Sequence, residues 1–156
     1  MDELQENDIQ DPRLRRFYSY WRSQHVDQRP PSRSDLDPLD FSYVIGFVTL
    51  IDVEPNPLRF RFRLVASTVT EHLGYELTGK YLDEVPEPGL RTYLDDAYRR
   101  LVRDRRPLYE GGDRTLDLRI WRHESVLLPC TDADGVVSMI LSARVTQMPR
   151  RVASSG

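Results

Sequence analysis

Residues 60–82 read FRFRLVASTVTEHLGYELTGKYL, and the local pattern changes twice within this stretch. It begins with alternating Phe and Arg, the two-residue period of a strand with one buried face. Ser67 or Thr68 can cap a short helix, and Glu71 stands where a capping box with Thr68 requires an acidic side chain. Gly74 is suited to end that helix, and the Leu-Thr-Gly-Lys corner behind it reads as a turn. The stretch therefore predicts a strand, a short helix and a tight corner in immediate succession.

The rest of the chain supplies more strands than helices. Apolar and β-branched runs predict strands over 44–53, 59–66, 107–111, 116–129 and 136–145. Helical spacing and cap signals predict helices over 12–26, 38–43, 67–73 and 89–105. The runs Gly111–Asp113 and Asp132–Gly135 read as a break and a hairpin turn. This order predicts an α+β fold, a five-stranded antiparallel sheet with short helices on one face and an additional N-terminal helix.

That N-terminal helix carries an apolar stripe. Asp11 and Pro12 give a helix start, with Asp as the N-cap and Pro at the first helical position. The stripe consists of Leu14, Phe17, Tyr18, Trp21 and His25. It has two interpretations, packing against the chain's own sheet or a seam between two copies, and its residues are our candidates for a homodimer interface.

Composition narrows the class of protein. The 156 residues fit one domain, which we place at 11–146 between a flexible acidic segment 1–10 and a flexible tail 147–156. No run of 18 apolar residues and no leader pattern is present, and the net charge is -3. We therefore expect neither a membrane span nor nucleic-acid binding. Cys130 is the one cysteine, which agrees with a cytoplasmic setting.

No group of residues predicts catalysis or a metal site. His123, Glu124 and Ser125 include base, acid and nucleophile types, but strand neighbours point to opposite faces and cannot form a triad. The three histidines and Cys130 lack metal-ligand spacing. The basic cluster Arg99–Arg106 reads as the solvated end of a helix, with acidic residues nearby to pair with it, and a binding role for it stays open.

The order of elements resembles a PAS domain, a family of sensory and interaction modules. It is most similar to bacterial single-domain PAS proteins that carry a helix and a PSR-D-DP segment before the first strand. The matching residues are Trp21 and the segment PSRSDLDP at 31–38, then FRFRLVAS and HLGYELTGKYLDEV, and lastly ESVLLPCTDADGVVSMIL. The resemblance implies that the corner at 74–80 turns the chain back across the sheet, so that the short helices and the sheet face enclose a pocket.

That resemblance implies a non-enzymatic sensory or regulatory module acting through a protein partner, with room for a small ligand. The candidate pocket residues are Leu64, His72, Leu73, Tyr81, Leu82, Tyr93, Leu94, Ala97, Trp121 and Met139. Flavin-binding relatives place a reactive cysteine in a helix, whereas Cys130 ends a strand. Haem-binding relatives take a histidine from the long helix, and 89–105 has none. We expect neither cofactor, and the identity of any ligand stays open.

Two other functions compete with a sensor. One is a small α+β-roll enzyme of hydrolase or isomerase type, which would need an acid–base pair on inward strand positions. The other is a ligand-free interaction or adaptor domain whose pocket its own side chains fill. A filled and an empty pocket use the same apolar residues, so the sequence leaves these alternatives open.

Overall fold

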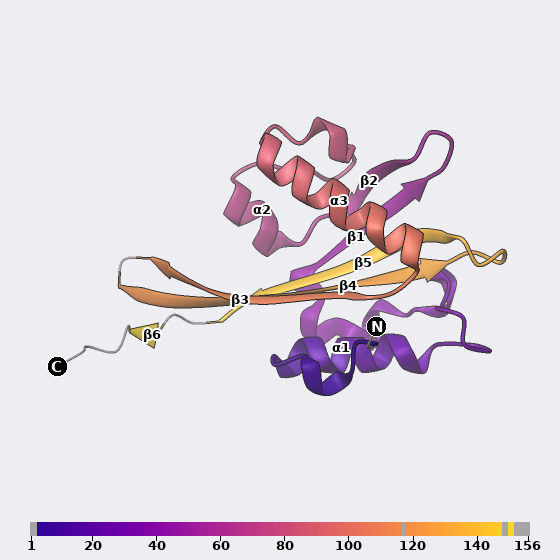
Figure 1. The fold of residues 1–156 in the computed structure, drawn as a ribbon, viewed down its shortest axis with the longest axis horizontal. Coiled ribbons are helices and arrows are strands. Elements are labelled where there is room, and N and C mark those ends of the chain that lie inside the picture. Colours follow the sequence, from indigo (N-terminus) through magenta and orange to yellow (C-terminus); the bar gives the residue numbers. More distant parts are fainter. Residues whose placement is uncertain (1–2, 117, 148–149, 152–156) are drawn as a thin grey trace.

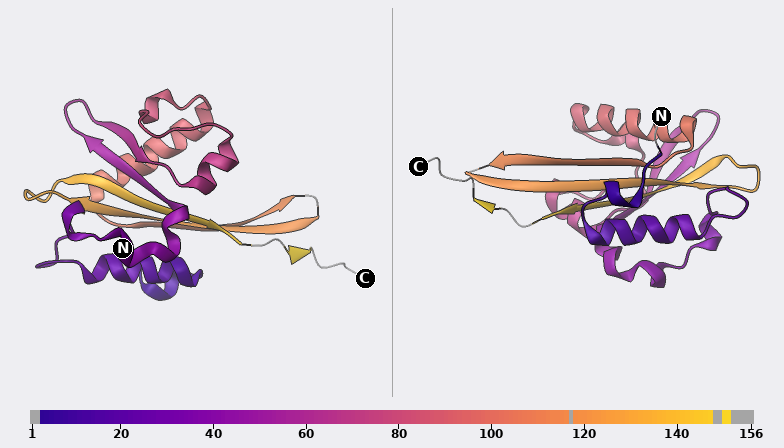
Figure 2. Two further views of the ribbon diagram at one scale, coloured as in Figure 1. Left: turned by 180° about the vertical axis from the view of Figure 1, so that it is seen from behind. Right: turned by 60° about the horizontal axis from the view of Figure 1, so that its bottom comes forward.

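The computed structural model describes residues 3–116, 118–147 and 150–151. Figure 1 shows three layers, with helices α2 and α3 on one face of a sheet and helix α1 on the other. Figure 2 shows the same layers from behind and tilted, and in both views one long hairpin projects beyond the helices. The α helices are α1 Pro12–Ser23, α2 Ser67–Leu73 and α3 Pro88–Asp104. The 3-10 segments are η1 Glu6–Asp8, η2 Arg33–Asp35, η3 Pro38–Phe47 and η4 Leu82–Glu84.

The sheet is antiparallel and confirms the α+β prediction. Its strands are β1 Val48–Glu54, β2 Arg59–Leu64, β3 Leu108–Leu116, β4 Arg119–Thr131, β5 Val137–Thr146 and β6 Arg150–Arg151. Neighbours run in the order β2-β1-β5-β4-β3, and β6 pairs with β4 beyond the end of β5. The strands from the two ends of the chain thus form one sheet, since β5 lies between β1 and β4.

The corner at 74–80 protects an edge of the sheet. Gly74 ends α2 in the left-handed conformation at φ 81°, as the sequence predicts, and Gly79 has φ 86°. These two turns bring the chain back beside β2, where the Gly79 N–H donates to the Phe62 carbonyl. The Phe62 N–H in turn donates to the Lys80 carbonyl, so the free side of β2 gains a short partner.

The start of α2 differs from the predicted capping box. Ala66 is the N-cap, and no side chain caps the helix. The hydroxyls of Ser67 and Thr68 instead donate to the Gly46 carbonyl, and the Ala66 N–H donates to Thr49 Oγ1. These contacts tie the helix to the entry of β1 rather than to its own first turn.

Two apolar clusters lie on opposite faces of the sheet. The cluster beneath α1 contains Ile9, Leu14, Phe17, Tyr18, Trp21, Phe41, Val44, Val48, Val126, Leu128, Cys130, Met139, Leu141, Ala143 and Val145. The cluster beneath α2 and α3 contains Ile51, Phe60, Phe62, Val65, Leu77, Leu82, Val85, Ala97, Tyr98, Leu101, Leu127, Val137 and Ile140. Most successive residues of β4 and β5 alternate between the two clusters, as strand geometry requires. The exception is Val137, which lies on the face opposite Met139 because the register with β4 shifts between them.

Two strand predictions change in the structure. The first strand begins at Val48 instead of residue 44, because 44–47 continue the 3-10 segment η3. The predicted break at Gly111–Asp113 is absent, and β3 continues through it in unbroken register with β4. Glycine fits there because a Cβ on Gly111 would lie 2.9 Å from the Arg122 guanidinium across the ladder.

Part of the segment 1–10, which the sequence predicts to be flexible, packs against the core. Ile9 is 0% exposed, and Leu4 packs against the same cluster beneath α1. Burial of these two apolar side chains holds the segment on the protein. Helix α1 ends at Ser23, so the predicted helix 12–26 is too long by its last turn. In the tail, Arg150–Arg151 pair with β4, while 148–149 and 152–156 lie outside the described residues.

Candidate functional site

Four of the candidate pocket residues come together beneath α2 and α3. Leu82 is 3% and Ala97 is 6% exposed, and both belong to the apolar cluster of that face. Leu73 and Leu94 are half-buried against the same cluster. The cluster is continuous with sheet residues such as Ile140, so these side chains pack on the sheet directly.

The other candidates on this side have different surroundings. Leu64 and Tyr93 are 42% and 46% exposed, and His72 is exposed. The Tyr81 hydroxyl donates to Glu54, and the Arg59 guanidinium lies 3.5 Å from the centre of its ring. Tyr81 thus faces the polar outer side of the hairpin formed by β1 and β2.

Trp121 and Met139 also lie outside the expected pocket. Trp121 is half-buried on the projecting hairpin of β3 and β4, opposite Arg114 in register. Met139 is 3% exposed but belongs to the cluster beneath α1, which corrects its assignment to the pocket. The reason is strand parity, because Met139 pairs with Cys130 on one face while its neighbour Ile140 faces the other.

The stripe of α1 packs within its own chain. Leu14, Phe17, Tyr18 and Trp21 are at most 3% exposed, and the Trp21 indole N–H donates to the Pro129 carbonyl at 2.8 Å. His25 lies beyond the helix with its ring edge-on to Trp21 at 4.4 Å. Of the two interpretations of the stripe, the structure contains the intrachain one, and a second copy cannot reach these side chains while α1 is in place.

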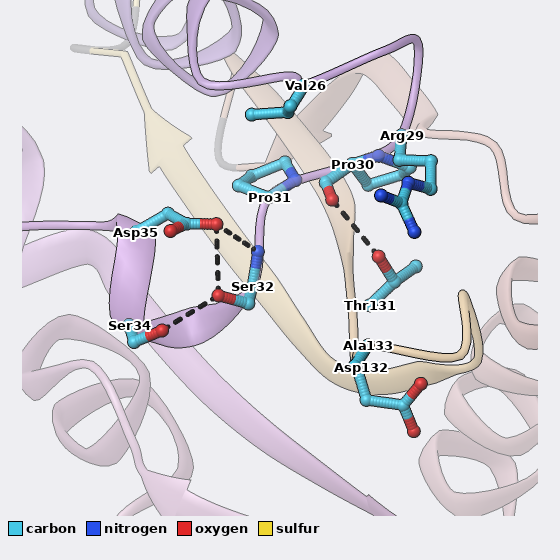
Figure 3. Close-up of a pocket in the computed structure, with 10 residues that line it drawn as sticks. All are labelled: Val26, Arg29, Pro30, Pro31, Ser32, Ser34, Asp35, Thr131, Asp132 and Ala133. Atoms are coloured by element: carbon cyan, nitrogen blue, oxygen red, sulfur yellow. Dashed lines mark hydrogen bonds between the residues drawn. The ribbon is translucent and has the colours of Figure 1, made fainter.

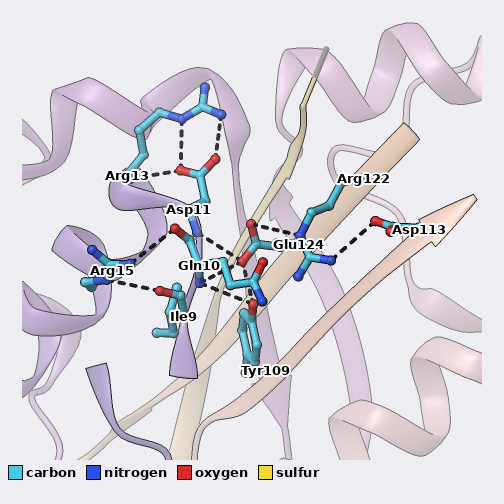
Figure 4. A network of polar contacts seen from close by, with 9 residues as sticks. All are labelled: Ile9, Gln10, Asp11, Arg13, Arg15, Tyr109, Asp113, Arg122 and Glu124. Carbon is cyan, nitrogen blue, oxygen red and sulfur yellow. Dashed lines mark hydrogen bonds and ion pairs between the residues drawn. The ribbon is translucent and has the colours of Figure 1, made fainter. Parts of the chain in front are cut away.

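A buried carboxylate joins the N-terminal segment to the sheet, as Figure 4 shows. Glu124 on β4 is 0% exposed, and its Oε1 accepts the backbone N–H groups of Gln10 at 3.0 Å and Asp11 at 3.1 Å. The Tyr109 hydroxyl donates to the same oxygen. Glu124 Oε2 lies 3.8 Å from Arg122 Nε, close enough for a charge pair. We call Gln10, Asp11, Tyr109, Arg122 and Glu124 the latch.

Asp11 has a second role at the start of α1. Its Oδ1 accepts the Arg13 N–H at 2.8 Å as an N-cap, and its Oδ2 pairs with the Arg13 guanidinium at 2.9 Å. Burial raises the pKa of Asp11, but the side-chain and backbone donors of Arg13 outweigh it and hold the pKa below the ordinary value. The sequence predicted the cap but not the burial of Asp11, which is 2% exposed.

The latch itself was missed by sequence reasoning. By sequence alone, Glu124 reads as an ordinary strand position beside His123. Its signal was its parity, since it shares a face with Val126 and Leu128 in an otherwise apolar set. A carboxylate in such a set must find donors, because an unpaired buried charge is strongly unfavourable.

A surface hollow of about 390 Å³ lies between the Pro-rich connector and the turn after β4. Figure 3 shows its lining residues Val26, Arg29, Pro30, Pro31, Ser32, Ser34, Asp35, Thr131, Asp132 and Ala133. Thr131 donates from its N–H to the Pro31 carbonyl and from its hydroxyl to the Pro30 carbonyl. The Asp35 and Asp132 carboxylates accept N–H groups of their own turns. These contacts fix the connector, as expected for a Pro-rich segment.

Cys130 and the basic cluster of α3 do not combine into a reactive site. Cys130 is 0% exposed beneath α1, on the face opposite α2 and α3, and burial raises the pKa of its thiol to about 12. Arg99 and Arg103 of the basic cluster pair with Asp95 and Asp104. Within the described residues no group of three or more His, Cys, Asp or Glu could hold a metal ion. None of the helices described there is long and apolar enough to cross a membrane.

Comparison with known proteins assigns the chain to a family. The sequence profile of the PAS domain matches residues 9–143. The chain belongs to the PAS domain family. The match includes α1 and the latch residues, so the PAS region begins ahead of the first strand here. No curated protein matches the chain.

Solved structures similar to the chain include PAS and light-oxygen-voltage domains. The PAS domain of Bordetella pertussis BvgS is 20% identical over 77% of this chain and 90% of that chain, with a TM-score of 0.49. A light-oxygen-voltage domain studied with a flavin analogue is 10% identical over 65% and 76%, with a TM-score of 0.44. A fungal light-oxygen-voltage photoreceptor domain is 13% identical over 74% and 95%, with a TM-score of 0.41.

Proposed function

We propose that this PAS domain is a non-enzymatic regulatory module that acts by binding other proteins, with an interior filled by its own side chains. PAS domains are typically sensory or regulatory modules. The observation that carries the proposal is the packing of Leu82 and Ala97, which are 3% and 6% exposed in one cluster with the sheet. Side chains that fill this space leave binding surfaces, rather than an enclosed ligand, as the means of output.

The positions of the acid and base residues support a module without catalysis. His123 pairs with Gly112 in register, on the face that carries Leu127. Glu124 is on the opposite face, where its Oε1 accepts two backbone N–H groups. A general base and its acid must meet at one reacting group, and these two side chains point away from each other.

Ligand sensing is the second candidate function. Two of the candidate pocket residues, Leu64 and Tyr93, are large apolar side chains that are 42% and 46% exposed. Apolar side chains left open on the helix-covered side are what a small ligand or a protein partner would cover.

A cytoplasmic location is part of the proposal and rests on Cys130 being a free thiol.

Native mass spectrometry with an absorbance spectrum on freshly purified protein tests the proposal. We expect the mass of the bare chain, alone or in whole multiples, and no visible absorbance. A bound non-protein mass, or the spectrum of a flavin or a haem, would overturn the filled interior and establish the ligand sensor in its place.

The substitution Ala97→Trp separates the two functions by stability. In a filled interior the larger side chain overpacks the cluster and lowers the free energy of unfolding by about 1–3 kcal/mol. A ligand pocket would instead accept the indole without that loss. Arg100→Trp is the matched control, because Arg100 is exposed on the same helix. Chemical denaturation of both variants measures the difference.

A further inference from the structure

The two edges of the sheet are treated differently. The edge strand β2 is covered by the segment at Gly79 and Lys80. The edge strand β3 pairs with β4 along its whole length without a register shift. Figure 1 views the sheet from the β3 edge, with α3 above it and α1 below it rather than across it. In the described part of the chain, β4 is the only strand neighbour of β3.

The β3 edge carries charges of both signs, Glu110, Asp113 and Arg114, but it lacks several other devices that keep an edge strand from pairing. Its sequence, LYEGGDRTL, holds no proline and no lysine, and it has no bulge. Gly112 is informative here, because a Cβ at this position would meet only His123 ring atoms, at 3.6 Å and 3.7 Å. These are ordinary contacts, and the φ of Gly112 is not in the left-handed region. Packing within one chain therefore does not require glycine at 112, whereas close approach of another backbone favours it.

We propose that β3 pairs edge to edge with β3 of a second copy, antiparallel, about a two-fold axis at Gly112. This register places Glu110 opposite Arg114 of the second copy, and symmetry repeats that opposite-charge pair. It also places Leu108 opposite Leu116 of the second copy. The pairing makes one continuous sheet from two domains and satisfies the outward backbone groups of both edges.

Neighbouring registers lose the complementarity. An axis at Gly111 places Glu110 opposite Gly112 and Arg114 opposite Leu108, so neither charge has a partner. An axis at Asp113 places the two Asp113 residues opposite each other, and like charges there are unfavourable. Charge pairing along the strand therefore selects Gly112 as the centre.

The proposal concerns self-assembly alone and is independent of the proposed regulatory function. It also differs from a seam at the α1 stripe, because Phe17 and Trp21 are already buried in their own chain. A protein that proved monomeric would overturn the β3 pairing and leave the proposed partner binding untouched.

Disulfide trapping tests the position of the axis. Residues facing each other in an antiparallel pair have Cα atoms about 4.5–5.5 Å apart, which a disulfide can span. We expect Gly112→Cys to form a disulfide-linked dimer under mild oxidation. Glu110→Cys is the control on the same strand, since its two copies lie four positions out of register and should stay unlinked. The native Cys130 is buried and does not compete.

Sedimentation velocity of the unmodified chain and of charge variants gives a second, independent test. We expect a concentration-dependent dimer that Glu110→Arg weakens by about tenfold or more, with Arg114→Glu acting alike. The double variant with both changes exchanges the charges and should restore the dimer. A monomeric parent chain, failure of the exchange to restore pairing, or equal trapping of Gly112→Cys and Glu110→Cys would overturn the proposal. If Gly112→Cys fails to fold, as circular dichroism would reveal, the charge exchange decides.

Discussion

The two faces of the sheet are both covered, but their covers are held by different contacts. Beneath α2 and α3 the contacts are apolar, with Phe60 and Tyr98 ring to ring at 5.4 Å. Beneath α1 an apolar cluster is combined with buried polar contacts, namely the Glu124 carboxylate and the Trp21 indole. Hydrogen bonds demand a specific geometry, whereas apolar contacts tolerate repacking.

The polar contacts determine where helix α1 lies on the sheet. An apolar stripe alone fixes neither the direction of a helix nor its position along a sheet. Polar contacts at both ends of α1 fix both. Glu124 accepts the two N–H groups immediately before the helix, and Trp21, in its last turn, donates to the Pro129 carbonyl. The face beneath α1 is therefore the more specific of the two and the more sensitive to polar substitutions.

Truncation of a buried side chain of α1 should lower the free energy of unfolding most. Phe17 is 0% exposed, so Phe17→Ala should lower the free energy of unfolding by about 3–5 kcal/mol. Arg22→Ala on the exposed side of the same helix should change it by less than about 0.5 kcal/mol. Urea denaturation measures both. Similar small effects for the two variants would mean that α1 does not cover the sheet in solution.

Removal of the latch carboxylate should come next in size. Glu124→Ala leaves the N–H groups of Gln10 and Asp11 without their acceptor, at a cost of about 2–3 kcal/mol. Amide hydrogen exchange should accelerate at 9–11 and in α1, while α3 keeps its protection. Ser125→Ala, at the neighbouring position on the other face, is the control. Uniform loss of protection in α1 and α3 would contradict separate covers for the two faces.

The sequence predicts the secondary-structure elements better than it predicts which face of the sheet each side chain meets. Strict alternation in β2 and helical spacing in α1 and α3 assign the elements, because one face of each is polar. In β5 the odd positions are apolar and the even positions are polar apart from Ile140. Both faces of the sheet are covered, so this alternation does not tell which face each set meets, and Met139 falls on the wrong side. The glycines at 111 and 112 read as a break, although both lie within β3, where Gly111 makes room for the Arg122 guanidinium.

The sequence does not predict the latch, and the reason is a different one. The role of Glu124 depends on its contact with Gln10, which lies more than a hundred residues away in the sequence. Local pattern assigns elements, whereas the polar contacts that orient them arise from pairs distant along the chain. Similarly, the alternatives for the α1 stripe could be separated only by seeing which surface lay beneath it.

A smaller effect is expected at the corner that covers the β2 edge. Gly79 has φ 86°, and a Cβ added there would meet nothing within 4 Å, so Gly79→Ala meets backbone strain alone, about 1–2 kcal/mol. Gly89→Ala at the start of α3 also meets nothing within 4 Å and lacks a positive φ. That control should keep or slightly raise stability. Thermal unfolding of the pair measures the contrast, and equal shifts would contradict the strained corner.

The smallest effect concerns Asp11 and depends on pH. Asp11→Ala removes the N-cap of α1 and should cost about 1 kcal/mol at neutral pH. Because the folded pKa of Asp11 lies below its ordinary value of 3.8, its contribution is full above that value and is lost as pH falls through the folded pKa. The stability gap between parent and variant should therefore close in acid. Denaturation at neutral and strongly acidic pH measures the gap, and one that persisted in acid would mean that the carboxylate charge does not hold the start of α1.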